Sequence, residues 1–142
     1  MKKAVFFPLL FLSLLVVAQK TSKRQDIQIL LSVLQVKTNM QKLVDDAVGI
    51  YKKQKPAVPQ QVWSEIKNKV DYSSFMNKLA AIYDKGYSEQ EIKQLIKSIK
   101  TLKSGQQPQL KPEVVEQSYI ASNLFGKYFT TLLKEQIKAK RY

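Results

Sequence analysis

The stretch that decides the fold is a helix start signal, Tyr87-Ser88-Glu89-Gln90-Glu91-Ile92-Lys93-Gln94-Leu95-Ile96. Ser88 and Glu91 have the spacing of a capping box, in which each side chain bonds the other residue's backbone amide. Tyr87 and Ile92 stand at the two positions of a hydrophobic staple around that box. Apolar residues then return at helical spacing, at Ile92, Leu95, Ile96, Ile99 and Leu102. The segment therefore predicts a capped amphipathic helix.

Upstream, the same apolar period predicts three helices before Asp71. Asp26 is expected to cap the first of them, which carries Ile27, Leu30, Leu31 and Leu34. The second runs from about Thr38 or Asn39 to Lys53, with an apolar face of Met40, Leu43, Val44, Ala47 and Tyr51. Pro59 suits the first turn of a short third helix, which carries Val62, Trp63, Ile66 and Val70.

A fourth helix is predicted between Asp71 and Gly86. Asp71 is a favourable N-cap residue, and the helix after it carries Phe75, Met76, Leu79, Ala80, Ile82 and Tyr83. Gly86 stands where a helix C-terminus favours a left-handed residue. The helix is therefore expected to end there, directly before the capping box.

Pro112 is expected to open the last and longest helix, which runs to about Lys138 after a loop over Ser104 to Pro108. Its apolar face is predicted from Val115, Tyr119, Phe129, Leu133 and Ile137, broadened by Leu124, Phe125, Tyr128 and Leu132. Ser122 and Gly126 interrupt this face and predict close approach of a neighbouring helix. No run predicts a strand and no repeat is evident. The expected class is all-α, a compact array of five to six helices with a long C-terminal helix.

The N-terminus has the pattern of a secretory signal peptide. Lys2 and Lys3 precede an apolar run that ends in Val16-Val17-Ala18, and a basic start, an apolar core and a small residue before the cut are typical of such signals. The run is shorter than the roughly 20 residues that a membrane-spanning helix needs. We expect cleavage after Ala18 and a periplasmic or secreted protein. The expected organisation is a signal peptide at 1–18, a polar segment at 19–26, one helical domain at 27–138 and a basic tail at 139–142.

The composition limits the chemistry. The chain has no Cys and no His, and zinc sites and triad hydrolases usually depend on these residues. The absence of Cys also excludes a lipid attached through an N-terminal cysteine, so the mature form is expected to have no membrane anchor. We predict no metal, no cofactor and no catalytic residue.

The positive charge comes almost entirely from lysine. Of 24 Lys and Arg, two lysines leave with the signal, so 22 cations face 11 acids and the mature chain carries +11. Base-edge recognition favours the arginine fork, and nucleic acid is therefore not the expected partner. A lysine surface serves solubility or weak attraction to anionic polymers and headgroups.

Residues 82–96, from Ile82 through the capping box to Ile96, resemble a family of bacterial exported proteins, the domain-of-unknown-function family 2059. Leu30-Leu31, Gln107-Pro108-Gln109-Leu110 and Gly126 also look like that family's pattern. Members usually close the helix with Phe-Tyr and then Ser-Pro-x-Gly, whereas this chain has Ser98-Ile99 and Thr101-Leu102-Lys103-Ser104. The resemblance implies export and a helical fold, and it implies no established activity.

The acids are mostly explained by helix ends. Asp26, Asp71, Glu89, Glu91, Glu113 and Glu116 lie at or near predicted N-termini, where capping and the helix dipole favour them. Glu65 with Lys69, and Asp46 with Lys42, have the spacing of surface pairs. A carboxylate hydrolase acting on envelope polymers is the alternative function, and it would need two acids that converge in a cleft.

Lysines and aromatics supply the candidate binding surface. Lys93, Lys97 and Lys100 lie beside the apolar face of one helix, where they would either bind an anionic group or extend their stems over the core edge. The aromatics, which include Tyr83, Tyr87, Tyr119, Phe125 and Tyr128, would either fill the core or form a groove for an amphipathic ligand or partner helix. We predict non-catalytic binding of an amphipathic or anionic ligand, or of an envelope protein, by these eight residues.

Overall fold

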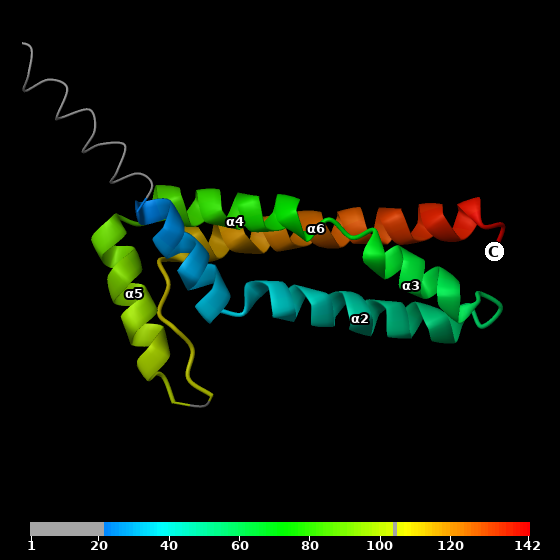
Figure 1. Ribbon diagram of the computed structural model, residues 1–142, viewed down its shortest axis with the longest axis horizontal. Coiled ribbons are helices and arrows are strands. Elements are labelled where there is room, and N and C mark those ends of the chain that lie inside the picture. Colours follow the sequence, from blue (N-terminus) through cyan, green and yellow to red (C-terminus); the bar gives the residue numbers. More distant parts are fainter. Residues whose placement is uncertain (1–21, 104) are drawn as a thin grey trace, which may run out of the picture.

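The computed structural model describes residues 22–103 and 105–142, and every regular element in these ranges is a helix (Figure 1). The elements are a helix over residues 22–33, α2 (Val36–Gln54), α3 (Gln60–Asn68), α4 (Tyr72–Gly86), α5 (Glu89–Thr101) and α6 (Pro112–Ala139). The predicted all-α class and long C-terminal helix are confirmed. The predicted signal segment 1–18, its cut after Ala18, and Ser104 lie outside the described residues.

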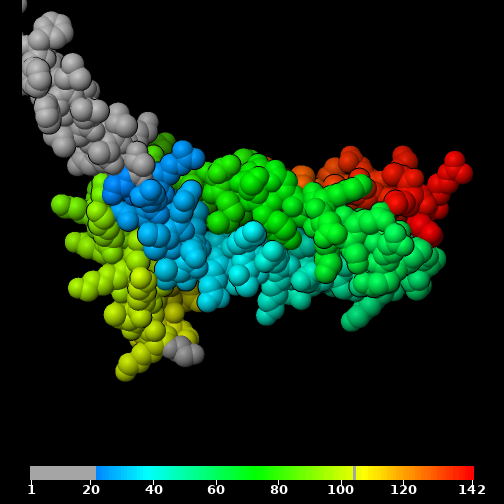
Figure 2. All heavy atoms as spheres, in the orientation of Figure 1, coloured from blue at the N-terminus to red at the C-terminus, as the bar shows by residue number. Residues whose placement is uncertain are grey.

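Helices α4 and α6 form the long axis of the molecule and run side by side in opposite directions (Figure 1). Helix α2 lies against α4 and α3, and α3 contacts α6. Helix α5 and the segment that follows it project from one end of this body (Figure 2). None of the helices in the described ranges is both long enough and apolar enough to cross a bilayer.

The core is apolar and draws on every helix. The largest fully buried side chains are Trp63, Ile27, Leu30, Ile66, Ile92, Leu133, Val44 and Val114. Trp63 satisfies its indole N–H by donating to the carbonyl of Val58 at 3.1 Å, as a buried polar group must. Each fully buried large apolar side chain stabilises the fold by about 1.5–3 kcal/mol.

Two of the predicted N-caps, Asp71 and Ser88, are confirmed. Asp71 accepts hydrogen bonds from the amides of Ser73 and Ser74. Ser88 and Glu91 form the full capping box, with the amide of Ser88 bonded to the Glu91 carboxylate at 2.7 Å. Pro112 occupies the first turn of α6, as predicted.

The first helix starts earlier than predicted. Residues 22–33 are helical, so Asp26 lies inside the helix and does not cap it. Two contacts hold the first turn: the Ser22 hydroxyl donates to Glu89 at 3.0 Å and Lys23 pairs with Asp84 at 2.9 Å. Lys, Arg and Gln are also good helix formers, which the prediction of a polar segment over 19–26 did not weigh.

Gly86 has a different role from the predicted one. The only glycine with positive φ in the described ranges is Gly105, at 85°, so Gly86 does not form a left-handed helix end. A Cβ on Gly86 would instead collide with the side chain of Val114. The glycine therefore permits the close approach of α4 to the start of α6.

The packed face of α6 also differs from the prediction. Val115 and Tyr119 are 49% and 67% exposed, and Val114 and Ala121 are buried in their place. The burial of Phe125, Phe129, Leu133 and Ile137 agrees with the prediction. From Ala121 to Ile137 the buried residues recur every four positions, so the buried face turns gradually around the helix axis. Both α4 and α3 pack against α6. Ser122 and Gly126 face outward, so the small residue in the packed face is Ala121.

Candidate functional site

The eight predicted surface residues do not come together on one surface. Tyr83, Tyr87 and Phe125 are buried, whereas Tyr119, Tyr128 and the three lysines of α5 are exposed. They divide among three places: the junction of α4 with α5, the α4–α6 interface and the outer sides of α5 and α6. Two of them, Phe125 and Tyr128, line a pocket.

Tyr83 and Tyr87 are structural. Their rings stack with centroids 5.8 Å apart and an interplanar angle of 16°. Burial raises the pKa of Tyr83 to about 12. The Tyr87 hydroxyl accepts from the Lys111 amide at 2.8 Å, and the Lys111 ammonium lies 4.7 Å from the Tyr87 ring centroid. The pair thus holds the segment before α6 against the end of α4.

A pocket of about 120 Å³ opens between the first turns of α4 and the middle of α6. Phe125 is one of its lining residues. The centroid of the Phe125 ring lies 5.2 Å from that of Phe75, 5.9 Å from that of Tyr72 and 5.9 Å from that of Tyr128. The pocket is lined by Asp71, Ser74, Phe75, Lys78, Ala121, Leu124, Phe125 and Tyr128. We call this site the aromatic pocket.

Hydrogen bonds fix the polar side of the aromatic pocket. The Tyr128 hydroxyl accepts from the amide of Asp71 at 3.0 Å and reaches the carbonyl of Lys69 at 3.5 Å. The hydroxyl and amide of Ser73, with the amide of Ser74, lower the pKa of the Asp71 carboxyl. The carboxylate of Asp71 is therefore committed to capping α4.

Lys78 gives the aromatic pocket a cation. It is exposed, and it makes no ion pair or hydrogen bond with any residue that the structure describes. Leu124, also exposed, extends the apolar lining outward. The arrangement suits an apolar group with a negative charge beside it.

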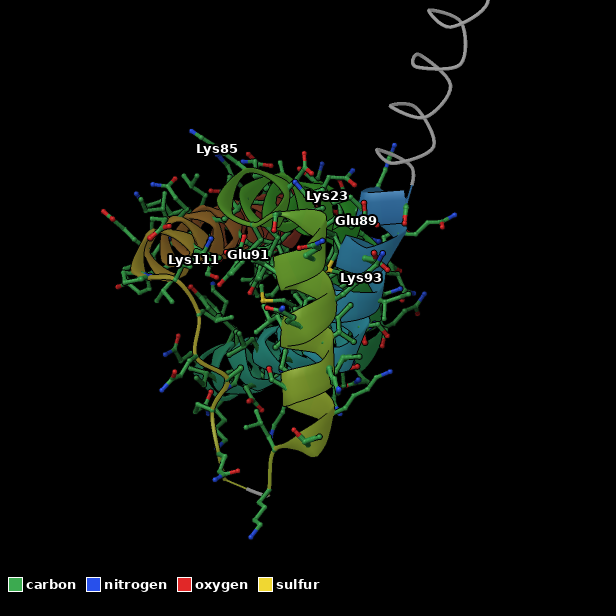
Figure 3. All side chains as sticks on the ribbon, turned by 90° about the vertical axis from the view of Figure 1, so that its left-hand side faces the viewer. Lys23, Lys85, Glu89, Glu91, Lys93 and Lys111 are labelled. Carbon is green, nitrogen blue, oxygen red and sulfur yellow. The ribbon has the colours of Figure 1, made fainter. Side chains whose placement is uncertain are left out.

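Of the three candidate lysines of α5, Lys93, Lys97 and Lys100, only Lys93 is paired with acids in the described residues. Lys93 lies 2.6 Å from Glu89 (Figure 3) and 3.7 Å from Asp26, and its hydrogen bond to the Glu89 carboxylate raises the pKa of Lys93. Lys97 and Lys100 are exposed and make no ion pair within 22–103 and 105–142. None of these three lysines lines the aromatic pocket.

Lys111, which the sequence analysis did not single out, is central to the end of the molecule where α4, α5 and α6 meet. Its ammonium lies 2.8 Å from Glu91 and donates to the carbonyl of Gly86 at 2.9 Å (Figure 3). The hydrogen bonds from Lys111 and from the Ser88 amide lower the pKa of Glu91 to about 2. We call this set of contacts, together with Glu89–Lys93 and Lys23–Asp84, the helix junction. No spacing in the sequence marks Lys111 as a partner of Glu91.

Most carboxylates of the described residues form ion pairs or cap helices. Glu65 pairs with Lys140 at 2.8 Å, not with the predicted Lys69, and Asp45 pairs with Lys67 at 2.9 Å. Every carboxyl pKa shift resolved in these ranges is downward, for Glu65, Asp71, Glu89 and Glu91. A general acid needs a raised pKa, so these groups give the hydrolase alternative no support. No group of three or more Asp, Glu, His or Cys within the described ranges could hold a metal ion.

Comparison with known proteins adds no further residues to the site. The chain matches no protein-family model, no curated protein sequence and no solved structure. The resemblance of residues 82–96 to the bacterial exported family stays a prediction, and the candidate site rests on its own geometry.

Proposed function

We propose that the protein is exported and binds, without catalysis, an amphipathic anionic ligand or a protein partner through the aromatic pocket. The signal pattern over residues 1–18 supports export to the periplasm or the medium. The resemblance to exported bacterial proteins of unknown function agrees with that destination. The observation that carries the binding function is the pocket of aromatic side chains with Lys78 at its margin.

The size of the aromatic pocket defines what enters it. Its volume of about 120 Å³ is close to that of an apolar cavity of about 150 Å³ that holds benzene. One phenyl ring or one branched aliphatic group therefore fits, and an entire lipid does not. The rest of a larger ligand or partner would lie outside, over Leu124 and Lys78.

Two small probes separate the apolar and ionic contributions. Phenylacetate carries a ring and a carboxylate, and benzyl alcohol has a similar ring without the charge. We expect phenylacetate to bind with a Kd in the millimolar range, as suits so small a ligand, measured by NMR titration of the processed protein. Lys78→Gln should weaken phenylacetate about twofold to fivefold, the value of an exposed ion pair, and leave benzyl alcohol unchanged. Lys134→Gln, an exposed lysine of α6 outside the pocket, is the control.

Blocking the aromatic pocket tests the site itself. Ser74 is exposed and lines the pocket, so Ser74→Phe should fill it and abolish saturable binding of both probes. Ser64→Phe places the same side chain at an exposed position of α3, and this variant should bind both probes as wild type does. Equal binding by Ser74→Phe and wild type would rule out the aromatic pocket as the binding site.

Export is tested separately. Mass spectrometry of the protein purified from its host envelope or medium should give a chain that begins at Gln19. A chain that keeps residues 1–18 and stays in the cytoplasm would contradict the proposed localisation.

A further inference from the structure

The outer side of α6 is an uncharged helix face without a covering helix. Among the residues that the structure describes, none forms a helix on this side of α6, which lies at the margin of the molecule in Figure 3. Val115 and Tyr119 are exposed there, and they are followed at helical spacing by the exposed Ser122 and Gly126. We call Val115, Tyr119, Ser122 and Gly126 the outer face of α6.

The outer face has a projection and a hollow. Tyr119, at 67% exposure, is the most exposed large hydrophobic side chain of the described residues. Seven residues along, Gly126 has open space where a side chain would lie. The surface there is hollowed and lined by Asn123, Gly126, Lys127, Thr130 and Thr131.

Charged residues lie along one edge of this face. At 100° per residue, Glu116 and Lys127 fall on the same edge, separated by eleven residues. Both are exposed, and neither makes an ion pair within the part of the chain that the structure describes. An acid and a base therefore lie on either side of Ser122, the centre of the face.

We propose that two copies of the chain pair through the outer face of α6 in antiparallel orientation. A twofold axis near Ser122 places Tyr119 of each copy opposite Gly126 of the other, so the projection enters the hollow. The same register brings Glu116 of each copy within about two residues of Lys127 of the other, along the same edge. One self-complementary patch thus supplies both sides of the contact, as a twofold interface requires.

The charge pattern favours a second copy over an unrelated partner. In the antiparallel pair the twofold axis keeps each edge on its own side, so the attraction between Glu116 and Lys127 occurs twice. One helix against one helix is a small contact, and interfaces below about 1,200 Å² are typically weak. The net charge of +11 on each mature copy also opposes association. We therefore expect a reversible dimer, distinct from the ligand binding proposed for the aromatic pocket.

Sedimentation velocity tests the dimer on the protein expressed from its full sequence and processed by the host. Between about 10 µM and 1 mM, wild type should shift from monomer toward dimer. Tyr119→Ala should weaken dimerisation by removing the projection, and Gly126→Leu should weaken it by filling the hollow. A monomer across the whole range, or a dimer unchanged by both substitutions, would overturn the proposal.

Charge reversal tests the register. Glu116→Lys and Lys127→Glu should each raise the dimer Kd about tenfold, because symmetry applies each change twice. The double variant restores opposite charges in the proposed register and should return the Kd to near the wild-type value. Glu135→Lys and Lys42→Glu make the same changes in net charge at exposed positions elsewhere and should have smaller effects. A double variant as weak as the two single changes combined would overturn the antiparallel register, even if a dimer forms.

Discussion

The helix junction and the middle of α6 contain similar types of residue, but these residues have different roles. In the junction, Glu91 is bonded to Lys111 at the start of α6, and Glu89 to Lys93 within α5, so the acids and lysines neutralise each other between and within helices. In the middle of α6, Tyr119 and Leu124 are exposed, and Lys78 on the facing helix has no described ionic partner. Paired charges thus stabilise the packing of the chain on itself, and side chains without a described partner are the ones available for the proposed binding.

The largest expected difference between the two regions is in the free energy of unfolding after an apolar side chain is truncated. Ile92 is fully buried in α5, and Tyr119 is exposed on α6. Ile92→Ala should lower the free energy of unfolding by about 2–5 kcal/mol, and Tyr119→Ala should change it by no more than about 0.5 kcal/mol. Urea unfolding measures both. Similar losses from the two substitutions would show that the outer face of α6 contributes to the fold.

The next largest effect on stability is expected where Gly86 approaches Val114. Gly86→Ala introduces a Cβ that meets the Val114 side chain, and overpacking of this kind costs about 1–3 kcal/mol. Val114→Ala should relieve that collision, so the second substitution should cost less in the Gly86→Ala background than in wild type. Additive losses in this double-mutant cycle would argue against the contact.

The capping box is expected to have a smaller effect. Ser88→Ala removes the side chain that caps the Glu91 amide and should lower stability by about 1 kcal/mol. Ser122→Ala, in the middle of α6, should leave stability unchanged or raise it slightly, since alanine favours a helix interior. Thermal unfolding of both variants at low concentration, where a dimer does not contribute, checks the contrast.

Acid should weaken the helix junction through protonation of Glu91. The pKa of Glu91 is lowered from 4.5 to about 2 in the folded protein, so the unfolded chain binds more protons between these values. The stability from this carboxylate is full above about pH 4.5 and is lost as the pH falls toward 2. Urea titrations across this window should give a shallower pH dependence for Glu91→Gln than for wild type. Glu116→Gln, whose carboxylate lies outside the junction, should keep the wild-type slope.

Local signals in the sequence predicted the helix junction in part. Ser88 and Glu91 form the expected box, because capping depends on residues that are neighbours in the chain. The Lys111–Glu91 pair was missed because it joins residues 20 positions apart across a loop, and no periodic pattern records such a contact. The predicted helix end at Gly86 is confirmed, but the predicted left-handed conformation is wrong, because a sequence shows the glycine and not the helix that approaches it.

The face of α6 could not be predicted from periodicity alone. Two apolar tracks overlap in its first half, one through Val114 and Ala121 and one through Val115 and Tyr119. Which track is buried depends on where α4 lies, and that is tertiary information. For the same reason, the predicted binding surface combined Phe125 and Tyr128 with six residues that lie elsewhere in the fold. Phe125 and Tyr128 do line the aromatic pocket.

Intermolecular NOEs from phenylacetate to the protein test whether the aromatic pocket is the binding site. We predict contacts from the probe's ring protons to the Leu124 methyl groups and to the rings of Phe75, Phe125 and Tyr128, with loss of all of them in Ser74→Phe. NOEs to the side chains of Lys97 and Lys100, or to Tyr119 alone, would contradict the assignment of binding to the aromatic pocket.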